Sequence, residues 1–383
     1  MTKHINTKKI VLVSPFAAPL LFGGYEGEAG GAERQMVLIA NKLSEYDTEV
    51  GFCCKPFDVS TPRDNPKIRI FRNSFRYLGG SKLYWIIDGI GLMAGLAKVR
   101  PHWIIVRNGG PMLIFWVLFY KLFSRARFLF TVQSDKDIDP GLNRTGKSRF
   151  FYRVFRFMIR RADHLVCQHA RQQQLIAEHF GRKADIQPNL SSPLWPADPT
   201  IKRNKKEILW PGNTNDNKRF LIIPELAKLL LDHTFVVAVN NSDAGKFRRI
   251  AEQSAGHANI RFLGTVKPRK SEALYYTASL VLNTSLVEGF PNTFLQAWGA
   301  GIPVVTAGVD PSGIIERFSL GSVVSVPAGN KPEDIAALAA AISALTGDDE
   351  RYQTCCRNAG KYLDEFHNDR KIIARLAEIL GIN

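Results

Sequence analysis

The sequence has few cysteines and no long hydrophobic segment. These two features argue against a disulfide-stabilised protein and against a membrane-spanning one. Its five cysteines include two adjacent pairs, at 53–54 and 355–356, a spacing that suits neither a disulfide framework nor a C-x-x-C motif. We therefore expect reduced thiols and a reducing compartment. An apolar run at 112–120 ends at Lys121 and is too short to span a bilayer. The start, KKIVLVS, reads as a strand and not as a secretory signal.

Acidic residues are scarce in the first half of the chain. The formal net charge is +16, and residues 1–200 hold 29 Lys and Arg against 16 Asp and Glu, which leaves 22 and 19 beyond them. The first half therefore either meets an anionic partner or simply tolerates a basic surface, and the second half does not share this bias. A hydrophobic share of 45% and a charged share of 22% are typical of a globular protein. The length of 383 residues suggests two or three domains.

The segment 279–306 carries a clear pattern of strand, loop, helix and strand. Residues 280–282 and 302–305 are short apolar runs of the kind that buried parallel strands show. Between them a polar loop leads into a helix that begins at Pro291 and ends at two glycines. Open α/β sheets bind ligands at such loops, and a helix N-terminus suits a phosphate.

This segment resembles the nucleotide-sugar site of the family 4 glycosyltransferases, which are retaining enzymes of the GT-B fold. Their signature is Glu-x7-Glu around an E-G-F-G/P loop, followed by an apolar helix and P-V-V/I. Glu288, Gly289, Phe290 and Pro291 match the loop, whereas Gln296 stands at the position of the second glutamate. In the family the first acid contacts the donor sugar and the second holds the ribose. The resemblance thus implies that Gln296 hydrogen-bonds the ribose without a charge.

Two other segments carry the resemblance. Gly212 and Lys218 match the family pattern of Gly-Arg and a later Lys, which binds the donor phosphates, although Asn213 replaces the arginine and Arg219 follows the lysine. A solvent-facing lysine is the alternative. Near the start, the local sequence GGAER is also what family members carry close to the diphosphate and the acceptor. A glycine loop before a helix suits a phosphate by itself, but a purely structural loop is an equal alternative.

An acidic loop follows the predicted strand at 127–132. Asp135 lies in QSDKDID, where Gln133 stands in place of the histidine that family members usually have. The spacing of Asp135 and Asp137 is similar to a metal-binding D-x-D. We favour a solvated loop or an acceptor contact and expect no metal, because helix N-termini and a basic residue neutralise the diphosphate in this fold.

The resemblance implies catalytic roles for Lys218 and Glu288. The substrate-binding residues that it implies are Gly30, Gly31, Asp135, Asn213, Arg219, Gly289, Phe290, Pro291, Asn292, Thr293 and Gln296.

The predicted fold class is α/β, as a GT-B architecture of two facing Rossmann-like domains with an interdomain cleft. We expect an acceptor-side domain at 1–198, with the C-terminal helix 366–383 packed back on it, and a nucleotide-sugar-binding domain at 199–365. Predicted strands lie at 9–14, 49–54, 67–71, 103–106, 127–132, 162–167, 207–210, 234–239, 259–264, 280–282, 302–305 and 322–326. Predicted helices include 83–99, 170–179, 221–231, 331–345 and 372–380.

The function implied is that of a retaining glycosyltransferase of the hexosyltransferase type. It moves a sugar from a nucleotide-sugar, a UDP- or GDP-sugar that serves as co-substrate, to a hydroxyl group of a glycan or lipid-linked acceptor, with no other cofactor. Two alternatives remain. One is a sugar-nucleotide epimerase of the same fold. The other is a non-enzymatic nucleic-acid-binding protein, suggested by the charge, although no recognition motif for nucleic acid supports it.

A basic and aromatic segment bears on where in the cell the protein is located. Residues 149–161 read RFFYRVFRFMIRR, and Arg149, Arg153, Arg156 and Arg160 follow steps that place them along one side of a helix. A core helix with a solvated arginine face is one interpretation. The other is a helix on an anionic membrane surface. The second predicts a cytoplasmic protein bound peripherally to the inner face of the cell membrane, with a role in polysaccharide or glycolipid assembly.

Overall fold

The computed structural model describes the chain except for residues 1–6, 24–28, 56–63, 74–81, 108–109, 136–137, 141–152, 154–155, 197, 199, 241–242 and 383. The chain forms two compact units. Unit 1 comprises 1–190 and 369–383, and unit 2 comprises 191–368. The divisions therefore fall after Leu190 and Asn368, where the sequence placed them after 198 and 365.

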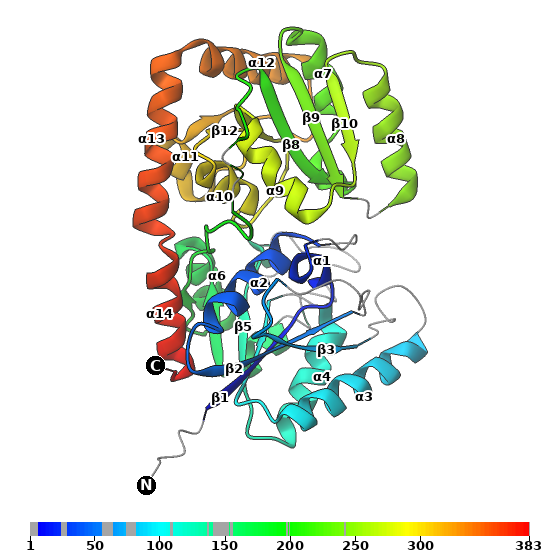
Figure 1. Ribbon diagram of the computed structural model, residues 1–383, viewed down its shortest axis with the longest axis vertical. Helices are drawn as coiled ribbons and strands as arrows, with labels where there is room; N and C mark the ends of the chain where they lie inside the picture. Colours follow the sequence, from blue (N-terminus) through cyan, green and yellow to red (C-terminus); the bar gives the residue numbers. More distant parts are fainter. Residues whose placement is uncertain are drawn as a thin grey trace. The chain divides into compact units, whose positions relative to one another are not determined.

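Unit 1 is built on a parallel sheet of seven strands in the order β3-β2-β1-β4-β5-β6-β7 (Figure 1). Its strands are short and apolar, and all four residues of β4 are buried, as is usual where helices cover both faces of a sheet. The strands are β1 (Lys8–Val13), β2 (Thr48–Cys54), β3 (Arg69–Arg72), β4 (Trp103–Val106), β5 (Arg127–Thr131), β6 (His164–Cys167) and β7 (Asp185–Ile186).

The helices of unit 1 include two from the first half that lie side by side, α3 and α4, and one from the C-terminus, α14 (Figure 1). The indole Nε1 of Trp103 in β4 donates to the Leu380 carbonyl at 3.0 Å, and α14 also packs against α2. The described helices are α1 (Ala18–Leu21), α2 (Gly31–Leu43), α3 (Lys82–Val99), α4 (Gly110–Leu122), α6 (Ala170–Phe180) and α14 (Asp369–Leu380).

Unit 2 has a parallel sheet of six strands in the order β10-β9-β8-β11-β12-β13. The strands are β8 (Glu207–Asn213), β9 (Thr234–Asn240), β10 (Ile260–Gly264), β11 (Leu280–Asn283), β12 (Val304–Thr306) and β13 (Gly321–Val323). The helices are η4 (Asp216–Lys218), α7 (Ile222–Leu229), α8 (Ala244–Ala255), α9 (Pro268–Thr277), α10 (Asn292–Gly299), η5 (Pro311–Gly313), α11 (Ile314–Arg317), α12 (Pro332–Gly347) and α13 (Asp349–Phe366).

Each sheet reverses its strand order beside its first strand. In unit 1 the reversal lies between β1 and β4, and in unit 2 it lies between β8 and β11. Loops that leave the carboxyl ends of such strands diverge to opposite faces of the sheet, and open α/β sheets bind ligands in the crevice that results. The topology therefore defines one candidate ligand-binding edge in each unit.

The fold confirms the predicted α/β class with two Rossmann-like units, and the predicted strands agree within a few residues. Several helices were not predicted: the longer α4, α8, α9 and α13, and the short α1 and α11. Pro291, predicted as the first helical residue, is the N-cap of α10 instead. The predicted strand at 207–210 continues to Asn213 and pairs with β9 along its full length.

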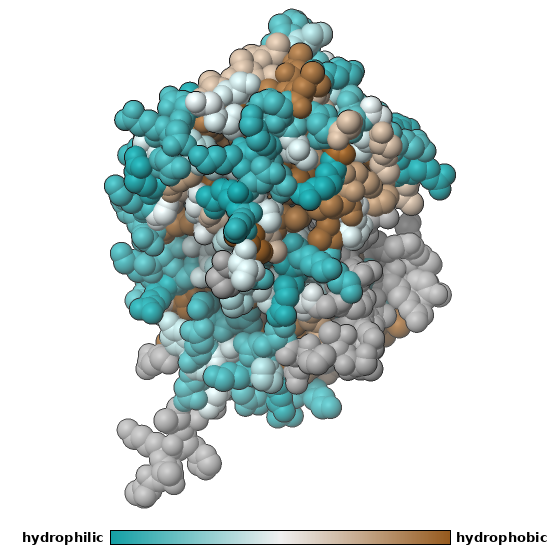
Figure 2. Space-filling model, turned by 45° about the horizontal axis from the view of Figure 1, so that its top comes forward, coloured by the Kyte–Doolittle hydropathy of each residue, from teal (hydrophilic) through white to brown (hydrophobic). Residues whose placement is uncertain are grey.

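All five cysteines are free, and four of them are buried. Burial raises the pKa of the Cys167 thiol to about 12, so this side chain is an unreactive thiol at neutral pH. In the part of the chain that the structure describes, no helix is long and apolar enough to cross a membrane. On the face drawn in Figure 2, hydrophobic clusters are exposed between larger hydrophilic areas.

Candidate active site

In unit 2, the loops that follow β8 and β11 are joined by hydrogen bonds centred on Asn217. Its side-chain Nδ2 donates to the Val287 carbonyl at 2.9 Å, and its Oδ1 accepts from the Val287 N–H at 3.2 Å. The Leu286 N–H donates to the Asn217 carbonyl at 3.0 Å. These three bonds resemble the hydrogen bonds between two paired strands. They hold the loop that follows β11 against η4. The sequence analysis did not identify Asn217.

This junction brings together the two predicted catalytic residues. Lys218 Nζ lies 2.5 Å from Glu288 Oε1, and each side chain is 21% exposed. The two are seventy positions apart in the chain. A partly exposed ammonium group has two further N–H donors, and a carboxylate has further lone pairs, so the pair can contact a ligand while it stays joined.

A second set of bonds supports the backbone of Lys218. Thr284 Oγ1 donates to the Lys218 carbonyl at 2.5 Å and accepts from Trp210 Nε1 at 2.8 Å. Trp210 is a β8 residue and is 1% exposed. The core of the sheet thus orients the loop through one hydroxyl group.

Arg219 lies beside Lys218, but its guanidinium points into the protein. The residue is 6% exposed and has a left-handed backbone with φ of 49°. Its N–H groups donate to carbonyl oxygens that follow three strands: Thr284 at 2.6 Å, Ala307 at 2.8 Å and Val326 at 2.6 Å. It also meets Pro327 O and Asn330 Oδ1, each at 3.2 Å. This geometry favours a positioning role over the direct substrate contact expected of Arg219.

The N-terminus of α10 lies at the end of the β11 loop. Pro291 is its N-cap and makes no side-chain cap, so the first-turn N–H groups, which include those of Asn292 and Thr293, face outward from the helix end. Among the described residues, the hydroxyls of Ser285 and Thr293 are buried without a hydrogen-bond partner. Unsatisfied donors around a helix N-terminus are suited to an anion.

The remaining predicted residues of unit 2 divide into two groups. Gln296 is half-buried and follows Asn292 by four positions, so it shares that side of α10. Phe290 is 8% exposed and packs on the rings of His367 and Trp298, with centroids 4.9 and 6.4 Å away. It therefore anchors the loop from inside. Gly289 is half-buried next to Glu288.

Asn213 is the last residue of β8, and its Oδ1 accepts from the Asn215 N–H at 3.1 Å. The bond forms an Asx-type turn that starts the loop toward Lys218. The expected phosphate contact of Asn213 stays a prediction. A Cβ at Gly212 would lie 2.6 Å from the Trp210 ring, so the chain needs glycine there for packing.

In unit 1 the predicted glycines begin α2. Gly30 is its N-cap, and Glu33 Oε2 accepts from the Gly30 N–H at 3.0 Å, which is the half of a capping box that a glycine N-cap allows. Gly30 and Gly31 are both exposed. The GGAER segment therefore has a structural function as a helix start. Burial raises the pKa of the Glu33 carboxyl.

Asp135 belongs to a polar cluster at the carboxyl edge of the unit 1 sheet. Its Oδ1 accepts from Gln172 Nε2 at 3.0 Å and lies 3.6 Å from His169 Nε2. Burial lowers the pKa of His169 against the opposing effect of the Asp135 carboxylate, which favours the neutral imidazole. Its Nδ1 is buried and has no partner among the described residues. Asp137 lies outside those residues.

A buried cation that was not predicted from the sequence, Arg107, also belongs to this cluster. Arg107 follows β4 directly, is 4% exposed and donates through Nη2 to Asn189 Oδ1 at 2.6 Å. Burial lowers its pKa to about 10 even though the Glu33 carboxylate opposes the shift. Its place in the sequence could have indicated a site residue, because Arg107, Gln133 and Gln168 each come soon after the end of a strand.

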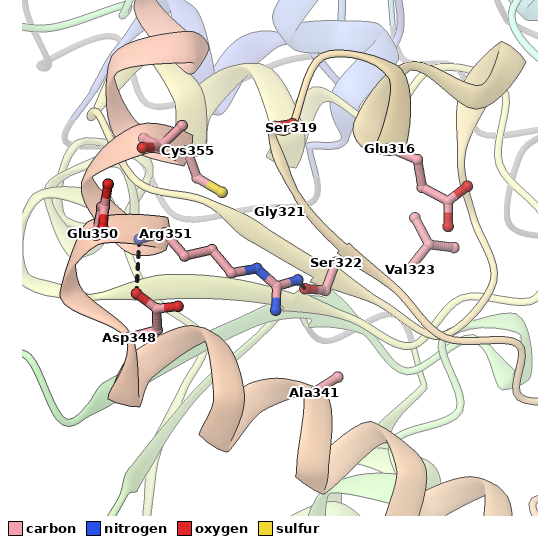
Figure 3. A pocket seen from close by; sticks show the side chains of 11 residues that line it. Glu316, Ser319, Gly321, Ser322, Val323, Ala341, Asp348, Glu350, Arg351 and Cys355 are labelled. Atoms are coloured by element: carbon pink, nitrogen blue, oxygen red, sulfur yellow. Dashed lines mark hydrogen bonds between the residues drawn. The ribbon is translucent and has the colours of Figure 1, made fainter.

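A separate cavity of about 580 Å³ lies in unit 2 by the edge strand β13 (Figure 3). Arg351 extends across it from α13, and its Nη2 donates to Ser322 Oγ at 3.0 Å. None of the predicted site residues lines this cavity. In the described residues, no group of three or more His, Cys, Asp and Glu side chains is arranged to hold a metal ion. The expectation of a metal-free site remains a prediction.

Two family descriptions match the chain. The Glycosyltransferase Family 4 description matches residues 29–189, and the Glycosyl transferases group 1 description matches residues 205–348. Together they span the cores of both Rossmann-like units. The chain belongs to the family 4 glycosyltransferases, and its fold is GT-B. No curated protein matches the sequence.

Similar solved structures show the same fold over nearly the whole chain. Sucrose-phosphate synthase from Thermosynechococcus elongatus has a TM-score of 0.74 at 15% identity, over 97% of this chain and 98% of that one. A variant of S. aureus TarM in complex with Fondaparinux, alpha-GlcNAc-glycerol and UDP has a TM-score of 0.71 at 12% identity, over 98% and 100%. A putative UDP-N-acetylglucosamine 2-epimerase from Listeria monocytogenes scores 0.62 at 14% identity, over 98% of each chain.

The hydrogen bonds of Arg219 predict a large effect on stability. In Arg219→Met, several buried carbonyl oxygens lose charged donors, so the free energy of unfolding should fall by about 3 kcal/mol or more. Lys218→Met, at the next position, should cost less than about 1 kcal/mol because Lys218 is partly exposed and bonds to a single partner. Urea unfolding of both variants measures the difference. Equal losses would show that Arg219 does not hold the strand ends together.

Proposed function

We propose that the protein is a retaining glycosyltransferase that transfers a hexose from a UDP- or GDP-sugar to an acceptor hydroxyl. The observation that carries the proposal is the contact between Lys218 and Glu288, held at the carboxyl ends of β8 and β11 next to the N-terminus of α10. A cation, a carboxylate and the N–H groups of a helix N-terminus together match a donor that combines a diphosphate with sugar hydroxyls.

In the proposed reaction the donor diphosphate lies at the N-terminus of α10. Lys218 Nζ and the first-turn N–H groups stabilise the negative charge that develops on the leaving phosphate oxygen. The bond between the anomeric carbon and that oxygen breaks, the acceptor oxygen bonds to the same carbon on the same face, and the acceptor proton passes to the leaving phosphate. The orphaned hydroxyls of Ser285 and Thr293 supply two further donors.

Glu288 and Gln296 would bind the other two parts of the donor. Glu288 accepts hydrogen bonds from sugar hydroxyls, while the contact with Lys218 orients its carboxylate. Gln296, on the side of α10 that carries Asn292, binds the ribose through its amide. Because the positive charge comes from a lysine and a helix terminus, the proposal requires no metal ion.

The polar cluster of unit 1 is the proposed acceptor site. Neutral His169 and Asp135 offer an acceptor and a carboxylate to an incoming hydroxyl. The proposed acceptor is a glycan or a lipid-linked sugar, in polysaccharide or glycolipid assembly at the inner face of the cell membrane. Arg153, Arg156 and Arg160 are exposed while Met158 and Ile159 are buried, which supports the basic helix face; Arg149 lies outside the described residues.

A sugar-nucleotide epimerase is the second candidate, because one similar structure carries that description. Incubation with a panel of nucleotide sugars, with and without hydroxyl acceptors, separates the two. A transferase forms a glycoside of the acceptor with unchanged anomeric configuration by NMR. Conversion of the donor to its epimer without an acceptor would instead identify an epimerase.

The role of Glu288 predicts the effect of a neutral replacement. Glu288→Gln keeps the shape but loses a charge-assisted contact of roughly 1.5–3 kcal/mol, so release of nucleoside diphosphate should slow by about tenfold or more. Glu225→Gln is the matched control, since Glu225 pairs with Lys228 at 2.8 Å on the surface of α7. Wild-type rates for Glu288→Gln with every accepted donor would remove Glu288 from the site.

The role of Gln296 predicts that one substitution keeps or strengthens nucleotide binding. Gln296→Glu introduces the acid that the family usually has there, and an ionised acceptor strengthens a hydrogen bond to a ribose hydroxyl. Calorimetric titration should show equal or tighter binding of the nucleoside diphosphate. Gln296→Ala should weaken it by about fivefold, the loss of one neutral hydrogen bond. Clearly weaker binding by Gln296→Glu would place the ribose elsewhere.

A further inference from the structure

The exposed side of α3 is apolar along most of its length. Ile86, Ile87 and Ile90 are 46, 55 and 58% exposed, and Ala94 and Ala97 farther along are also exposed. Steps of four, four and three place residues 86, 90, 94 and 97 in one row. The solvent-facing row of a surface helix is usually polar. Here the first charged residue after Ile90 on this helix is Lys98.

The neighbouring helix α4 continues this surface. Phe115 is 46% exposed, and Leu122 and Phe123 at the end of the helix are 72 and 74% exposed. The Phe119 ring stacks on that of Phe115 and meets that of Phe123, with centroids 6.1 and 5.2 Å away. Since α3 packs on α4, we treat the exposed apolar side chains of the two helices together and call them the α3–α4 apolar face, formed by Ile86, Ile87, Ile90, Phe115, Leu122 and Phe123.

The core of unit 1 does not require these side chains. Other residues of the same helices, Leu92, Leu96, Leu113 and Val117, fill the core and are at most 3% exposed. The exposed set therefore leaves a large apolar area in water, apart from the ring contacts of Phe115 and Phe123 with Phe119. Apolar surface that is concentrated in this way marks a contact with another partner.

The charges around the face indicate which partner. Residues 82–134 contain one acidic residue, Asp88, and it is 2% exposed. Lys98 and Arg100 at the end of α3 are exposed, as is Arg125 just beyond α4. The exposed arginines at 153, 156 and 160 add to the charge of the same unit. Beside the face, the exposed Asp163 is paired with Lys121 of α4 at 2.7 Å. An apolar face with a basic border, on helices that carry no exposed acid of their own, is complementary to a bilayer of anionic phospholipid.

We propose that the α3–α4 apolar face inserts into the interface of an anionic phospholipid bilayer, with the basic border at the headgroups. The inference rests on the proposed function for its purpose, because insertion would hold the acceptor site near lipid-linked substrates. It specifies a wedge of isoleucine and phenylalanine side chains, in addition to the arginine row, as the source of affinity. The face lies in the interface and does not span the membrane, consistent with the absence of a spanning helix among the described residues.

A second copy of the chain fits the face less well. A twofold dimer buries the same patch of both copies, so each basic border would meet itself. With no exposed acid in 82–134 to pair with it, such an interface would bring Lys98, Arg100 and Arg125 close to like charges. A bilayer offers the apolar layer and the opposite charge together.

Vesicle flotation with the full chain tests the proposal. The probes are vesicles of phosphatidylcholine and vesicles of phosphatidylcholine mixed with phosphatidylglycerol. The wild type should bind the mixed vesicles, and part of the binding should survive about 0.5 M salt, where the screening length is about 4 Å. The triple variant Ile87→Ser, Ile90→Ser and Phe123→Ser should lower the partition coefficient by about tenfold or more, because interfacial binding scales with buried apolar area.

Unit 2 offers a closely matched control. Leu221, Leu229 and Leu231 are 56, 54 and 79% exposed, against 55, 58 and 74% for the three residues of the face. Changing these leucines to serine removes similar apolar surface and should leave binding unchanged. Arg153, Arg156 and Arg160 changed together to Glu should weaken the initial attraction, and the effect should fade as salt rises.

Three results would overturn the proposal. The first is wild-type binding by the face variant, or equal losses in both serine variants. The second is the complete loss of wild-type binding in high salt, which would indicate adsorption by charge alone. The third is a dimer in sedimentation that the face variant dissociates, without vesicle binding, which would identify a second copy as the partner.

A separate readout keeps this proposal distinct from the proposed transferase activity. Thermal shift with UDP and GDP measures the unit 2 site, and the face variant should keep the shift of the wild type. If UDP or GDP raises the melting temperature but the protein does not bind vesicles, only the insertion proposal is refuted. Vesicle binding without a shift by any nucleoside diphosphate would refute the donor site and leave insertion standing.

Discussion

The proposed donor site depends on one constraint, the joining of two loops that leave neighbouring parallel strands. Strand order alone brings the ends of β8 and β11 together, but strand ends do not fix side chains. The bonds of Asn217 to Val287, and of Arg219 to Thr284, set the distance between the loops. The backbones of Lys218 and Glu288 are thereby held within reach of each other, which favours the preorganisation that electrostatic catalysis needs. The buried Arg219 stabilises a left-handed backbone position that glycine usually occupies.

The two units differ in charge and in the character of their exposed surface. Unit 2 has its binding groups at one helix terminus and one ion pair, and its half of the sequence is nearly balanced in charge. Unit 1 carries the excess of basic residues, a buried polar cluster around Arg107 and His169, and the exposed α3–α4 apolar face. A transferase with a soluble, nucleotide-linked donor and a lipid-linked acceptor would need this asymmetry, because one substrate arrives from water and the other from a bilayer.

Much of the fold followed from local pattern, and the failures have physical causes. β4 was predicted to the residue because its four apolar positions are all buried. α13 was missed because its buried positions, such as Tyr352 and Ala359, are diluted by charged neighbours, and α8 buries only Ile250 and Ser254. β8 continues through Pro211 because β11 pairs with β8 only at Ile208 and Leu209, so the missing N–H of the proline falls beyond that ladder.

Only those site residues that match the family pattern could be predicted from the sequence. Lys218 and Glu288 were identified by resemblance, whereas Asn217 and Arg107 act through contacts that no local pattern encodes. A crystal structure of the protein with its preferred nucleoside diphosphate would test the central claim most directly. The account predicts the diphosphate within hydrogen-bond distance of Lys218 Nζ and the first-turn N–H groups of α10, with the ribose at Gln296. A diphosphate bound elsewhere, with these groups uncontacted, would contradict it.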